Sequence, residues 1–381
     1  MEIGSGQLED LGIGDASTMF SNIYQNKTIL ITGHTGFKGS WLALWLSQLG
    51  ANIIGYALPA PSEPSHFAIL NLDIESVIGD VRDSNKLKKV FAEYKPEIVF
   101  HLAAQAIVRR SYDDPVETLS TNIMGTVNVF EAARKSGTAR AIINVTSDKC
   151  YANREWVWGY RENDPLGGYD PYSASKGCAE LVTNSWRDSF FNLKDYGKTH
   201  EILLASARAG NVIGGGDWAV DRLIPDIMRA ASKNKKVEIR NPEATRPWQH
   251  VLEPLSGYLL LGQKLLEGRK EFADAWNFGP DNGVQVTVGE IAEQVKRIWP
   301  VSDFDFHKPD GQPHEAGKLH LDCAKARSML NWSPVWDGKT AVEHTVRWYR
   351  AFHDEKAIQS LDDICGYISD AKEKHCSWVE S

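Results

Sequence analysis

The chain has 381 residues, enough for one large domain or two of ordinary size, and 42% of them are hydrophobic, which is ample for a buried core. Its 50 acidic and 42 basic residues give a formal net charge of −8 without a long run of either sign. This balance excludes a broad basic surface for nucleic acid or for an anionic membrane. We therefore expect a globular protein whose functional charges are local.

The cysteines show neither the spacing of a metal site nor that of a redox pair, and five of them form a poor disulfide framework. We expect no metal and a reducing, cytoplasmic environment. The first residues lack the basic and apolar regions of a signal peptide, and no stretch approaches the roughly 20 apolar residues of a membrane span. Residues 1–18, which are Gly-rich and acidic, are interpreted as a disordered extension. The five cysteines are Cys150, Cys178, Cys323, Cys365 and Cys376.

The first predicted strand, Lys27–Thr32, is followed at once by glycines and by a helix over residues 40–50. A second strand covers Asn52–Tyr56. Strands and helical stretches then continue to alternate, which predicts a doubly wound parallel sheet with helices on both faces, a Rossmann-like α/β fold. The further predicted strands are residues 77–80, 97–103 and 141–147.

After about residue 205 this alternation loosens. A Gly-rich loop over residues 210–218 precedes a predicted helix over 223–234, and short strands are expected at 237–240 and 276–279. These elements are too few to continue the doubly wound sheet. They predict a smaller, mixed α/β region.

A G-x-x-G-x-x-G motif lies between the first strand and its helix. A helix N-terminus presents free N–H groups and a positive dipole end to a pyrophosphate, and glycines let the phosphates approach. The alternative is a plain tight turn, but the strand before it and the helix after it favour a dinucleotide site. The residues that we expect to contact the cofactor there are Gly33, Thr35, Gly36, Phe37, Lys38 and Gly39.

The choice between NAD and NADP is less direct. The acidic residue that usually ends the second strand and binds the ribose is missing, since the sequence there is Tyr56–Leu58. No Arg or Lys between residues 52 and 81 could hold a 2′-phosphate, which favours NAD, with His34 and Lys38 as the reason for doubt. Asp80 would lie near the adenine, although a solvated turn carboxylate is an equal alternative.

Tyr172 and Lys176 are four residues apart on a predicted helix and share one of its faces. A lysine charge can stabilise the phenolate, whose formation near neutral pH requires the tyrosine pKa to fall by roughly 3 units from about 10. Such a pair is common by chance on protein surfaces. Here, however, it follows Thr146–Lys149, which ends an apolar strand at the edge of the sheet where ligands bind. We therefore predict a catalytic cluster.

Together these motifs resemble the extended short-chain dehydrogenase/reductase family, and the resemblance extends from residue 19 to about 355. Within it, the chain is similar to the sugar-nucleotide 4,6-dehydratases. At the strand end those enzymes carry a hydroxyl residue, an Asp and a Glu. This sequence has Ser147, Asp148 and Lys149. The lysine in the third position resembles the residue found in the enzymes that act on CDP-glucose. The segments that carry the resemblance are ITGHTGFKGSWL, HLAAQAIVRRSYDDP, TSDKCY, YDPYSASKGCAE, ARAGNVIGGGDWAVDRLIPD and RPWQHVLEPL.

The resemblance implies a reaction with NAD on CDP-glucose that yields the CDP-4-keto-6-deoxy sugar of bacterial surface polysaccharides. Tyr172 would take the C4 hydroxyl proton, Lys149 would remove the C5 proton, and Asp148 would protonate the departing C6 hydroxyl. Lys176 would bind the nicotinamide ribose and Ser147 the sugar O4.

Two physical requirements accompany these roles. Lys149 must be neutral against a reference pKa of about 10.4, and Asp148 must hold a proton against about 3.9, whereas an ion pair between them would shift both pKa values the wrong way. Adjacent strand residues also face opposite sides, so the chain must leave strand geometry here. A salt-bridged, structural Lys149 is the alternative.

The resemblance also implies further contacts. Asp80, Val81, Leu102, Ala103 and Ala104 would line the cofactor site. A homodimer would form through a four-helix bundle of the helices over residues 118–133 and 172–186, which carry Val127, Phe130 and Leu181. The arginine that often holds phosphate near the C-terminal part is absent from Gly311–Ala316. The residues implied for the sugar nucleotide are Gln105, Asn211, Arg222 and Arg246.

On this basis we expect an NAD-binding Rossmann domain over residues 19–208. Residues 209–360 would mainly bind the sugar nucleotide, with segments that return to the first domain, and 361–381 would be a C-terminal tail. Another sugar-nucleotide dehydratase or a 4-epimerase is the main alternative, but an epimerase would not need the Asp148–Lys149 pair. A catalytically silent NAD-binding sensor is a remote alternative.

Overall fold

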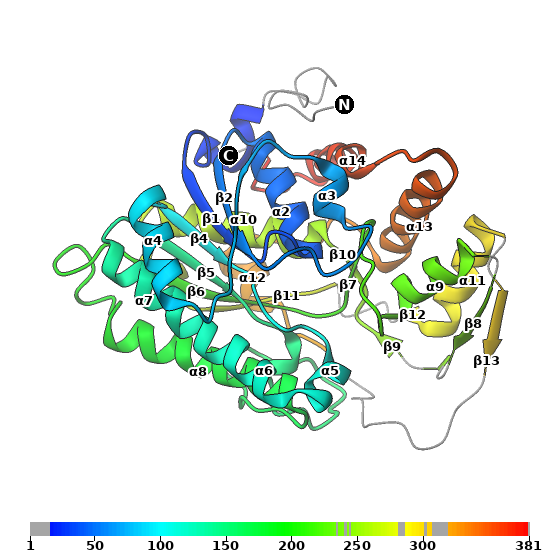
Figure 1. The fold of residues 1–381 in the computed structure, drawn as a ribbon, viewed down its shortest axis with the longest axis horizontal. Helices are drawn as coiled ribbons and strands as arrows, with labels where there is room; N and C mark the ends of the chain where they lie inside the picture. The colour runs from blue at the N-terminus through cyan, green and yellow to red at the C-terminus, as the bar shows by residue number, and fades with distance from the viewer. Residues whose placement is uncertain are drawn as a thin grey trace.

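The protein has two lobes, a larger one around a central sheet and a smaller one beside it (Figure 1). Among the described residues, no helix is both long and apolar enough to cross a bilayer. The computed structural model describes residues 16–233, 235–239, 242–243, 245–280, 286–300, 303–306 and 319–379.

The central sheet has seven strands, and every neighbouring pair in it is parallel. This confirms the predicted doubly wound, Rossmann-like sheet. The strand predicted at 276–279 does not belong to the smaller region but returns to the first domain, where it completes the edge of the central sheet and where Trp276 and Phe278 are fully buried. The spatial order is β11 (Ala275–Phe278), β6 (Leu203–Ala209), β5 (Ala141–Val145), β4 (Ile98–His101), β1 (Thr28–Thr32), β2 (Asn52–Ala57) and β3 (Glu75–Ile78).

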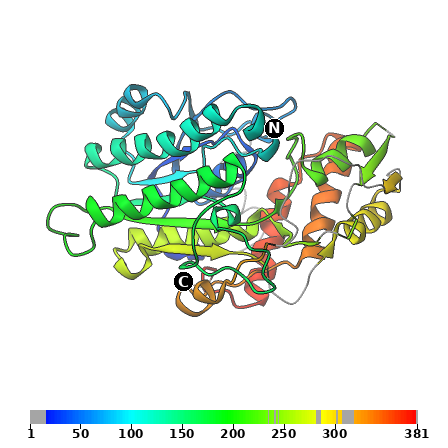
Figure 2. The ribbon, with the colours of Figure 1, turned by 90° about the horizontal axis from the view of Figure 1, so that it is seen from below.

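Helices cover both faces of the sheet, as Figure 2 shows from below. Successive strand side chains point to opposite faces. Ile29 and Ile31 therefore pack on one face, while Leu30 packs on the other. The first face is covered by α2 (Phe37–Gln48) and α10 (Leu252–Leu266), and the second by α4 (Ser84–Tyr94), α7 (Gly125–Ser136) and α8 (Pro171–Ser189).

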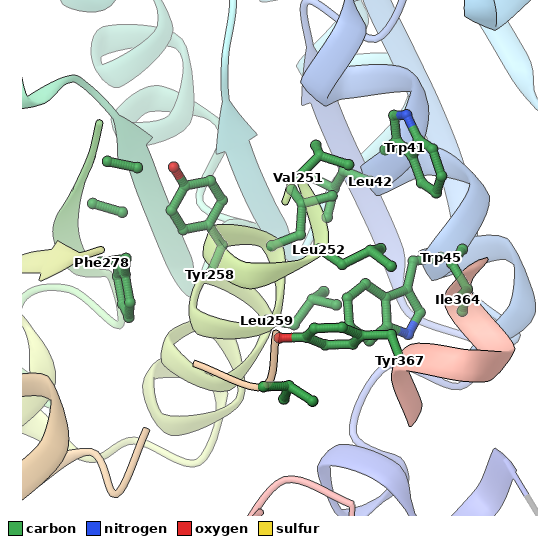
Figure 3. Packing of buried hydrophobic residues seen from close by; sticks show 14 of the residues in the cluster. Trp41, Leu42, Trp45, Val251, Leu252, Tyr258, Leu259, Phe278, Ile364 and Tyr367 are labelled. Carbon is green, nitrogen blue, oxygen red and sulfur yellow. The ribbon is translucent and has the colours of Figure 1, made fainter. Parts of the chain in front are cut away.

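Both ends of the described chain belong to the core. The expected C-terminal tail instead forms α14 (Ser360–Glu373), whose Ile364, Tyr367 and Ile368 are fully buried at helical spacing. Figure 3 shows Tyr367 packed among α2 and α10 side chains. At the other end, Phe20 N donates to Trp378 O at 2.8 Å and the two rings stack. Residues 1–15 of the expected extension lie outside the described residues.

The smaller lobe is built from short strand pairs and a few helices. Its strands pair as β7 (Val212–Ile213) with β10 (Gln249–His250), β8 (Lys236–Ile239) with β13 (Asp303–Phe306), and β9 (Thr245–Arg246) with β12 (Val286–Thr287). Its helices are α9 (Leu223–Ala231), α11 (Val288–Ile298) and α13 (Gly338–Glu355). The remaining elements are η1 (Ala16–Asn22), α3 (His66–Leu70), α5 (Val108–Asp113), α6 (Pro115–Leu119), η2 (Ser120–Met124), η3 (Asp148–Cys150), η4 (Lys270–Phe272) and α12 (Ala324–Met329).

Candidate active site

The turn between β1 and α2 is packed too closely for side chains. Gly33 has φ +80°, and a Cβ there would lie 2.8 Å from the backbone nitrogen of Ala103. A Cβ on Gly39 would lie 2.2 Å from the Gly33 carbonyl oxygen. No side chain caps α2 at Gly36, so its N-terminus is open to a ligand. This cradle fits the pyrophosphate of a dinucleotide.

His34 and Lys38, the two residues that left NADP open, do not offer a charge to a 2′-phosphate. His34 Nε2 lies 2.7 Å from Ser76 Oγ, and burial lowers the pKa of its imidazole to about 4, so the ring is neutral. Lys38 extends toward α10, where its Nζ lies 5.9 Å from the Tyr258 ring centroid. The described residues of this turn therefore suit NAD better than NADP.

The other residues expected at the cofactor follow β3 and β4. Asp80 comes after β3 and is paired with Arg82, with 2.5 Å between Oδ2 and Nη2, and hydrogen bonds from Arg82 lower the pKa of its carboxyl. The buried Val81 follows it. Ala103 N donates to Thr32 Oγ1 at 3.2 Å, so the segment after β4 lies beside the Gly-rich turn. It comprises Leu102, Ala103 and Ala104. Their cofactor contacts stay predictions.

The strand end after β5 leaves strand geometry, as the sequence required. Ser147 is still extended, and η3 begins with Asp148. The Ser147 hydroxyl donates to Asp148 Oδ1 at 2.9 Å and accepts from Lys149 N at 3.2 Å. The short helix thus turns the two adjacent side chains away from strand alternation.

Asp148 suits a proton donor. Burial is the largest influence on its carboxyl group and raises its pKa, although Lys149, Ser147 and Lys38 act in the opposite direction. Within the described part of the chain, Asp148 forms no ion pair with Lys149, so the salt-bridged alternative finds no support in this geometry.

Tyr172 and Lys176 lie together near the start of α8, and both are buried. The expected fall in the tyrosine pKa is not found. Burial raises the pKa of Tyr172 to about 12, whereas a hydrogen bond with Ser147 and the charge of Arg222 favour the phenolate. Burial also lowers the pKa of Lys176 to about 8, and its Nζ lies 3.5 Å from Val145 O. Desolvation therefore outweighs the neighbouring cations in the protein alone.

The residues expected to bind the sugar nucleotide differ in their surroundings. Arg222 pairs with Asp217 at 2.8 Å, and its charge favours the Tyr172 phenolate, so it lies near Tyr172 as expected for the candidate site. The Gln105 side-chain amide donates hydrogen bonds to Ile107 O and Thr118 Oγ1 and accepts one from Ile107 N. Asn211 precedes β7, and its carbonyl oxygen accepts from Gln249 N at 3.1 Å. The predictions for Arg246 and for Gly311–Ala316 concern a side chain and a segment that lie outside the described residues.

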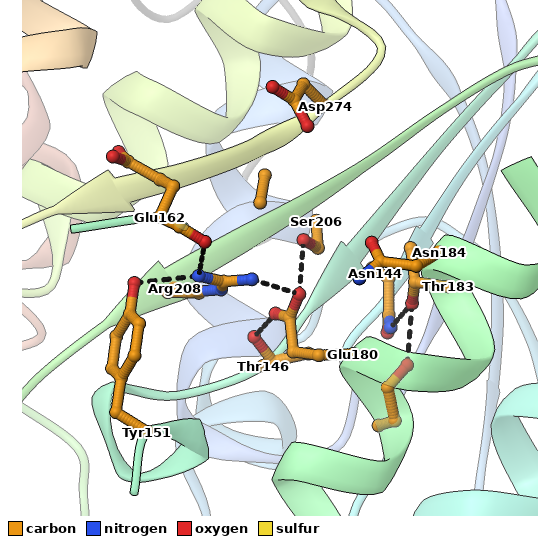
Figure 4. Close-up of polar contacts among 12 residues, drawn as sticks. Asn144, Thr146, Tyr151, Glu162, Glu180, Thr183, Asn184, Ser206, Arg208 and Asp274 are labelled. Carbon is orange, nitrogen blue, oxygen red and sulfur yellow. Dashed lines mark hydrogen bonds and ion pairs between the residues drawn. The ribbon is translucent and has the colours of Figure 1, made fainter. Parts of the chain in front are cut away.

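A buried polar network around Glu180 and Arg208 was missed from the sequence (Figure 4). Glu180, one turn beyond Lys176 on α8, accepts hydrogen bonds from Thr146 Oγ1 and, at 2.7 Å, from Ser206 Oγ and Arg208 Nη2. The network ties α8 to β6 and to the residue after β5, and so fixes the face of α8 that carries Tyr172 and Lys176. The spacing of Tyr172, Lys176 and Glu180 by four residues was the available signal.

Asn122 was also missed. It lies in η2, a π-helical turn, and its Nδ2 donates to Ser175 Oγ at 2.8 Å and to Gln105 O at 3.0 Å. It thereby joins the segment after β4 to α8. No pattern in the sequence distinguishes a π-helical turn from the helix around it.

Comparison with known proteins shows the family of the chain. The family model for GDP-mannose 4,6-dehydratase matches residues 30–345. A CDP-glucose 4,6-dehydratase of Salmonella typhimurium is 53% identical over 352 residues, which are 91% of this chain and 98% of the relative. Among solved structures, an epimerase from Methanothermobacter thermautotrophicus has a TM-score of 0.76 at 26% identity and covers 88% of this chain and 96% of its own.

A dTDP-glucose 4,6-dehydratase of Bacillus anthracis, solved with NAD, shares the fold with a TM-score of 0.69 at 19% identity, over 88% of this chain and 99% of its own. The family model covers the Gly-rich turn, the strand end after β5 and the start of α8. The chain belongs to the GDP-mannose 4,6-dehydratase family.

Proposed function

We propose that this protein is an NAD-dependent hydro-lyase that converts CDP-D-glucose into CDP-4-keto-6-deoxy-D-glucose. The observation that supports this proposal is the strand end after β5, where η3 carries a buried acid, Asp148, and a half-buried amine, Lys149, and where Asp148 lies close enough to Tyr172 to affect its pKa. The 53% identity to a CDP-glucose 4,6-dehydratase supports CDP-glucose as the sugar nucleotide. An epimerase has no use for an acid and a base that act on C5 and C6.

NAD would be held by the Gly-rich turn at the start of α2 and by Lys176 on α8. When bound, its nicotinamide supplies an acceptor for hydride from C4 and later the donor of that hydride to C6. The open N-terminus of α2 would offer N–H groups to the diphosphate of NAD, and the Arg222 guanidinium would bind the diphosphate of the sugar nucleotide.

Tyr172 removes the C4 hydroxyl proton in the first step. Its phenol is not a base in the protein alone, since burial raises its pKa to about 12. Ser147 and Arg222 favour the phenolate, and Ser147 is also positioned to bind the sugar O4. Oxidation at C4 makes the neighbouring C5 proton acidic.

Asp148 and Lys149 then eliminate water. The Lys149 amine takes the C5 proton, the electrons of that bond form the C5–C6 double bond, and the C6–O bond breaks. Asp148 supplies the proton that turns the departing hydroxyl into water, and its raised pKa keeps that proton available. After reduction at C6, a proton returns to C5 to complete the 4-keto-6-deoxy sugar.

The test offers CDP-, dTDP-, UDP- and GDP-sugars in parallel to the purified protein with NAD. We expect CDP-glucose to be consumed and a product to appear that absorbs as a 4-keto sugar in base. Consumption of another nucleotide sugar instead would assign that sugar nucleotide as the substrate. Conversion without a 4-keto-6-deoxy product would favour an epimerase. Absence of turnover with all four sugar nucleotides would favour the silent sensor.

We further propose that the protein is a cytoplasmic homodimer. All five cysteines are free thiols, which suits a reducing compartment. Apolar side chains are exposed along α6, η2 and α8, the helices that would form a bundle with their copies. Phe130, expected at this interface, is fully buried inside the protein, and Val127 is half-buried. The exposed side chains are Val116, Leu119, Met124 and Leu181.

A further inference from the structure

Lys38 is an unexpected residue for its position. Its backbone lies in the first turn of α2, where the helix dipole disfavours a cation. Arg222 and Lys176 add two nearby positive charges, and burial together with these charges lowers the pKa of the Lys38 amine to about 7. Within the described residues no ion pair with an acid holds it, and its ammonium faces the Tyr258 ring at 5.9 Å. A lysine so placed serves no evident structural purpose.

Tyr258 is the second unexplained residue. It lies on α10 and is fully buried, yet its hydroxyl has no hydrogen-bond partner among the residues that the structure describes. Helical side chains lean toward the N-terminal end of their helix, which for α10 is the end nearest the carboxyl edge of the sheet. Figure 3 shows the hydroxyl directed away from α10. A buried hydroxyl without a partner is rare in folded proteins and calls for a bound group or water.

Asp148 connects the two residues. The Lys38 ammonium lowers the pKa of the Asp148 carboxyl, and the Asp148 carboxylate contributes to the raised pKa of Tyr258. The Ser147 hydroxyl donates to Asp148, and the Asp148 charge acts on Tyr172 of α8. On the side of α2 and α10, Lys38 and Tyr258 contact each other and both interact electrostatically with Asp148. The first pair has a role in the proposed reaction at C4. The second pair has none.

We propose that Lys38 and Tyr258 serve the loss of water from C6, an inference that rests on the proposed dehydration. The Tyr258 hydroxyl binds the C6 oxygen as it leaves. When the O–H bond of Asp148 breaks and its proton forms the water, the Lys38 ammonium compensates the new carboxylate. Tyr258 is then a catalytic residue that touches the substrate, and Lys38 is a positioning residue that acts through Asp148.

The test uses Tyr258→Phe and Lys38→Met in the full-length protein with NAD and CDP-glucose. Tyr258→Phe removes one oxygen that has no hydrogen-bond partner in the described part of the chain, so it leaves the packing intact, and it carries the test if Lys38→Met fails to fold. We expect kcat to fall about 10²-fold, the size of effect seen when one stabilising donor is removed, while KM changes little. The C5 proton should still exchange with deuterated solvent, and enzyme-bound NADH should accumulate because C4 oxidation is untouched.

A second measurement separates this role from a role in cofactor binding. It is the affinity for NAD, monitored through the quenching of the intrinsic tryptophan fluorescence. Lys38 was expected from the sequence to contact the cofactor, but its side chain extends toward Tyr258 on α10. We therefore expect the NAD dissociation constant of both variants to stay within about twofold of the unchanged protein. A tenfold weaker NAD affinity of Lys38→Met, with normal product formation at saturating NAD, would make Lys38 a cofactor ligand. Wild-type kcat in Tyr258→Phe and in a folded Lys38→Met would overturn the inference. Failure of the unchanged protein to dehydrate CDP-glucose would instead reject the proposed function, so the two failures are distinguishable.

Discussion

Arg208 and Glu180 form an ion pair in the interior of the protein, with 2.7 Å between Nη2 and Oε2 and side chains that are 1% and 0% exposed. Arg208 also donates to Tyr151 Oη at 2.7 Å. Because the pair lies between α8 and β6, it holds the helix that carries Tyr172 and Lys176 against the sheet.

Glu180→Gln should therefore destabilise the protein strongly. Removal of one partner leaves the other charge buried without compensation, and we expect the free energy of unfolding to fall by about 3–5 kcal/mol. Denaturant-induced unfolding measures the loss. Glu271→Gln is the matched control, because its pair with Arg269 is about half exposed at 50% and 48% and should contribute at most about 1 kcal/mol. Equal, small losses in both variants would contradict this account.

Tyr172→Phe should lower C4 oxidation by about 10² to 10⁴-fold, the usual contribution of a general acid or base. Only the phenolic oxygen is removed, so the buried ring still packs and the fold should be kept. Single-turnover absorbance of NADH after mixing with CDP-glucose measures the step, and circular dichroism checks the fold. Near-normal turnover in a folded Tyr172→Phe protein would remove Tyr172 from its proposed role.

The parallel sheet and the position of the strand-end cluster were predictable because their signals are local. A short apolar strand, a Gly-rich turn and a helix in succession predict β1 and α2, and the chain order then places Ser147 and Asp148 at the carboxyl edge. The need to leave strand geometry at Asp148 also followed from the sequence, since adjacent strand residues face opposite sides.

What the sequence did not predict depends on contacts between distant segments. β11 joins β6 across about 70 residues of chain, and α14 packs on α2 across more than 300. The predicted direction of the Tyr172 pKa shift was wrong because the sequence does not show the burial, which outweighs the favourable hydrogen bond with Ser147 and the charge of Arg222. Glu180 and Arg208 were missed for the same reason, because their pairing needs the packed structure.

Stability should fall as pH decreases below about 6.5, and His66 is one cause. Its ring lies between Ser40 Oγ at 2.8 Å and Ser360 Oγ at 2.7 Å, and burial lowers its pKa to about 3. Between pH 6.5 and 3 the unfolded chain binds a proton that the native His66 does not, so each such histidine lowers the free energy of unfolding by about 1.4 kcal/mol per pH unit as the pH falls.

His66→Gln should therefore reduce that pH slope by about 1.4 kcal/mol per unit between pH 6 and 5. His101, His34 and His250 also have pKa values lowered by burial, so part of the slope will remain. Chemical unfolding at several pH values gives the slope, with the exposed His353→Gln as the control. An unchanged slope in His66→Gln would show that His66 binds its proton at the same pH in the native protein and in the unfolded chain.

The exposed apolar face of α6, η2 and α8 should bury itself in a dimer. Leu181→Glu places a charge on this face and should yield a monomer by light scattering at micromolar concentration, where the unchanged protein is a dimer. Met329→Glu, on α12 and similarly exposed, is the control and should leave the dimer intact. A monomeric unchanged protein would reject the four-helix bundle.

The role of Lys149 can be separated from that of Asp148. If Lys149 removes the C5 proton, Lys149→Ala should still oxidise C4, because Tyr172 and Lys176 are untouched, and should then stop before water is lost. Enzyme-bound NADH should accumulate without exchange of the C5 proton into deuterated solvent. Asp148→Asn is the matched comparison: it keeps the amine but removes the acid, so the C5 proton should exchange while water loss is blocked.

The two variants distinguish a chemical role of Lys149 from a purely electrostatic one. Lys149 lowers the pKa of the Asp148 carboxyl, so its loss should favour the protonated acid and, if that were its whole purpose, leave C5 exchange intact. Normal C5 exchange in Lys149→Ala would therefore assign the base to another group. NADH absorbance without exchange in Lys149→Ala, together with exchange in Asp148→Asn, would assign proton removal to Lys149 and proton donation to Asp148.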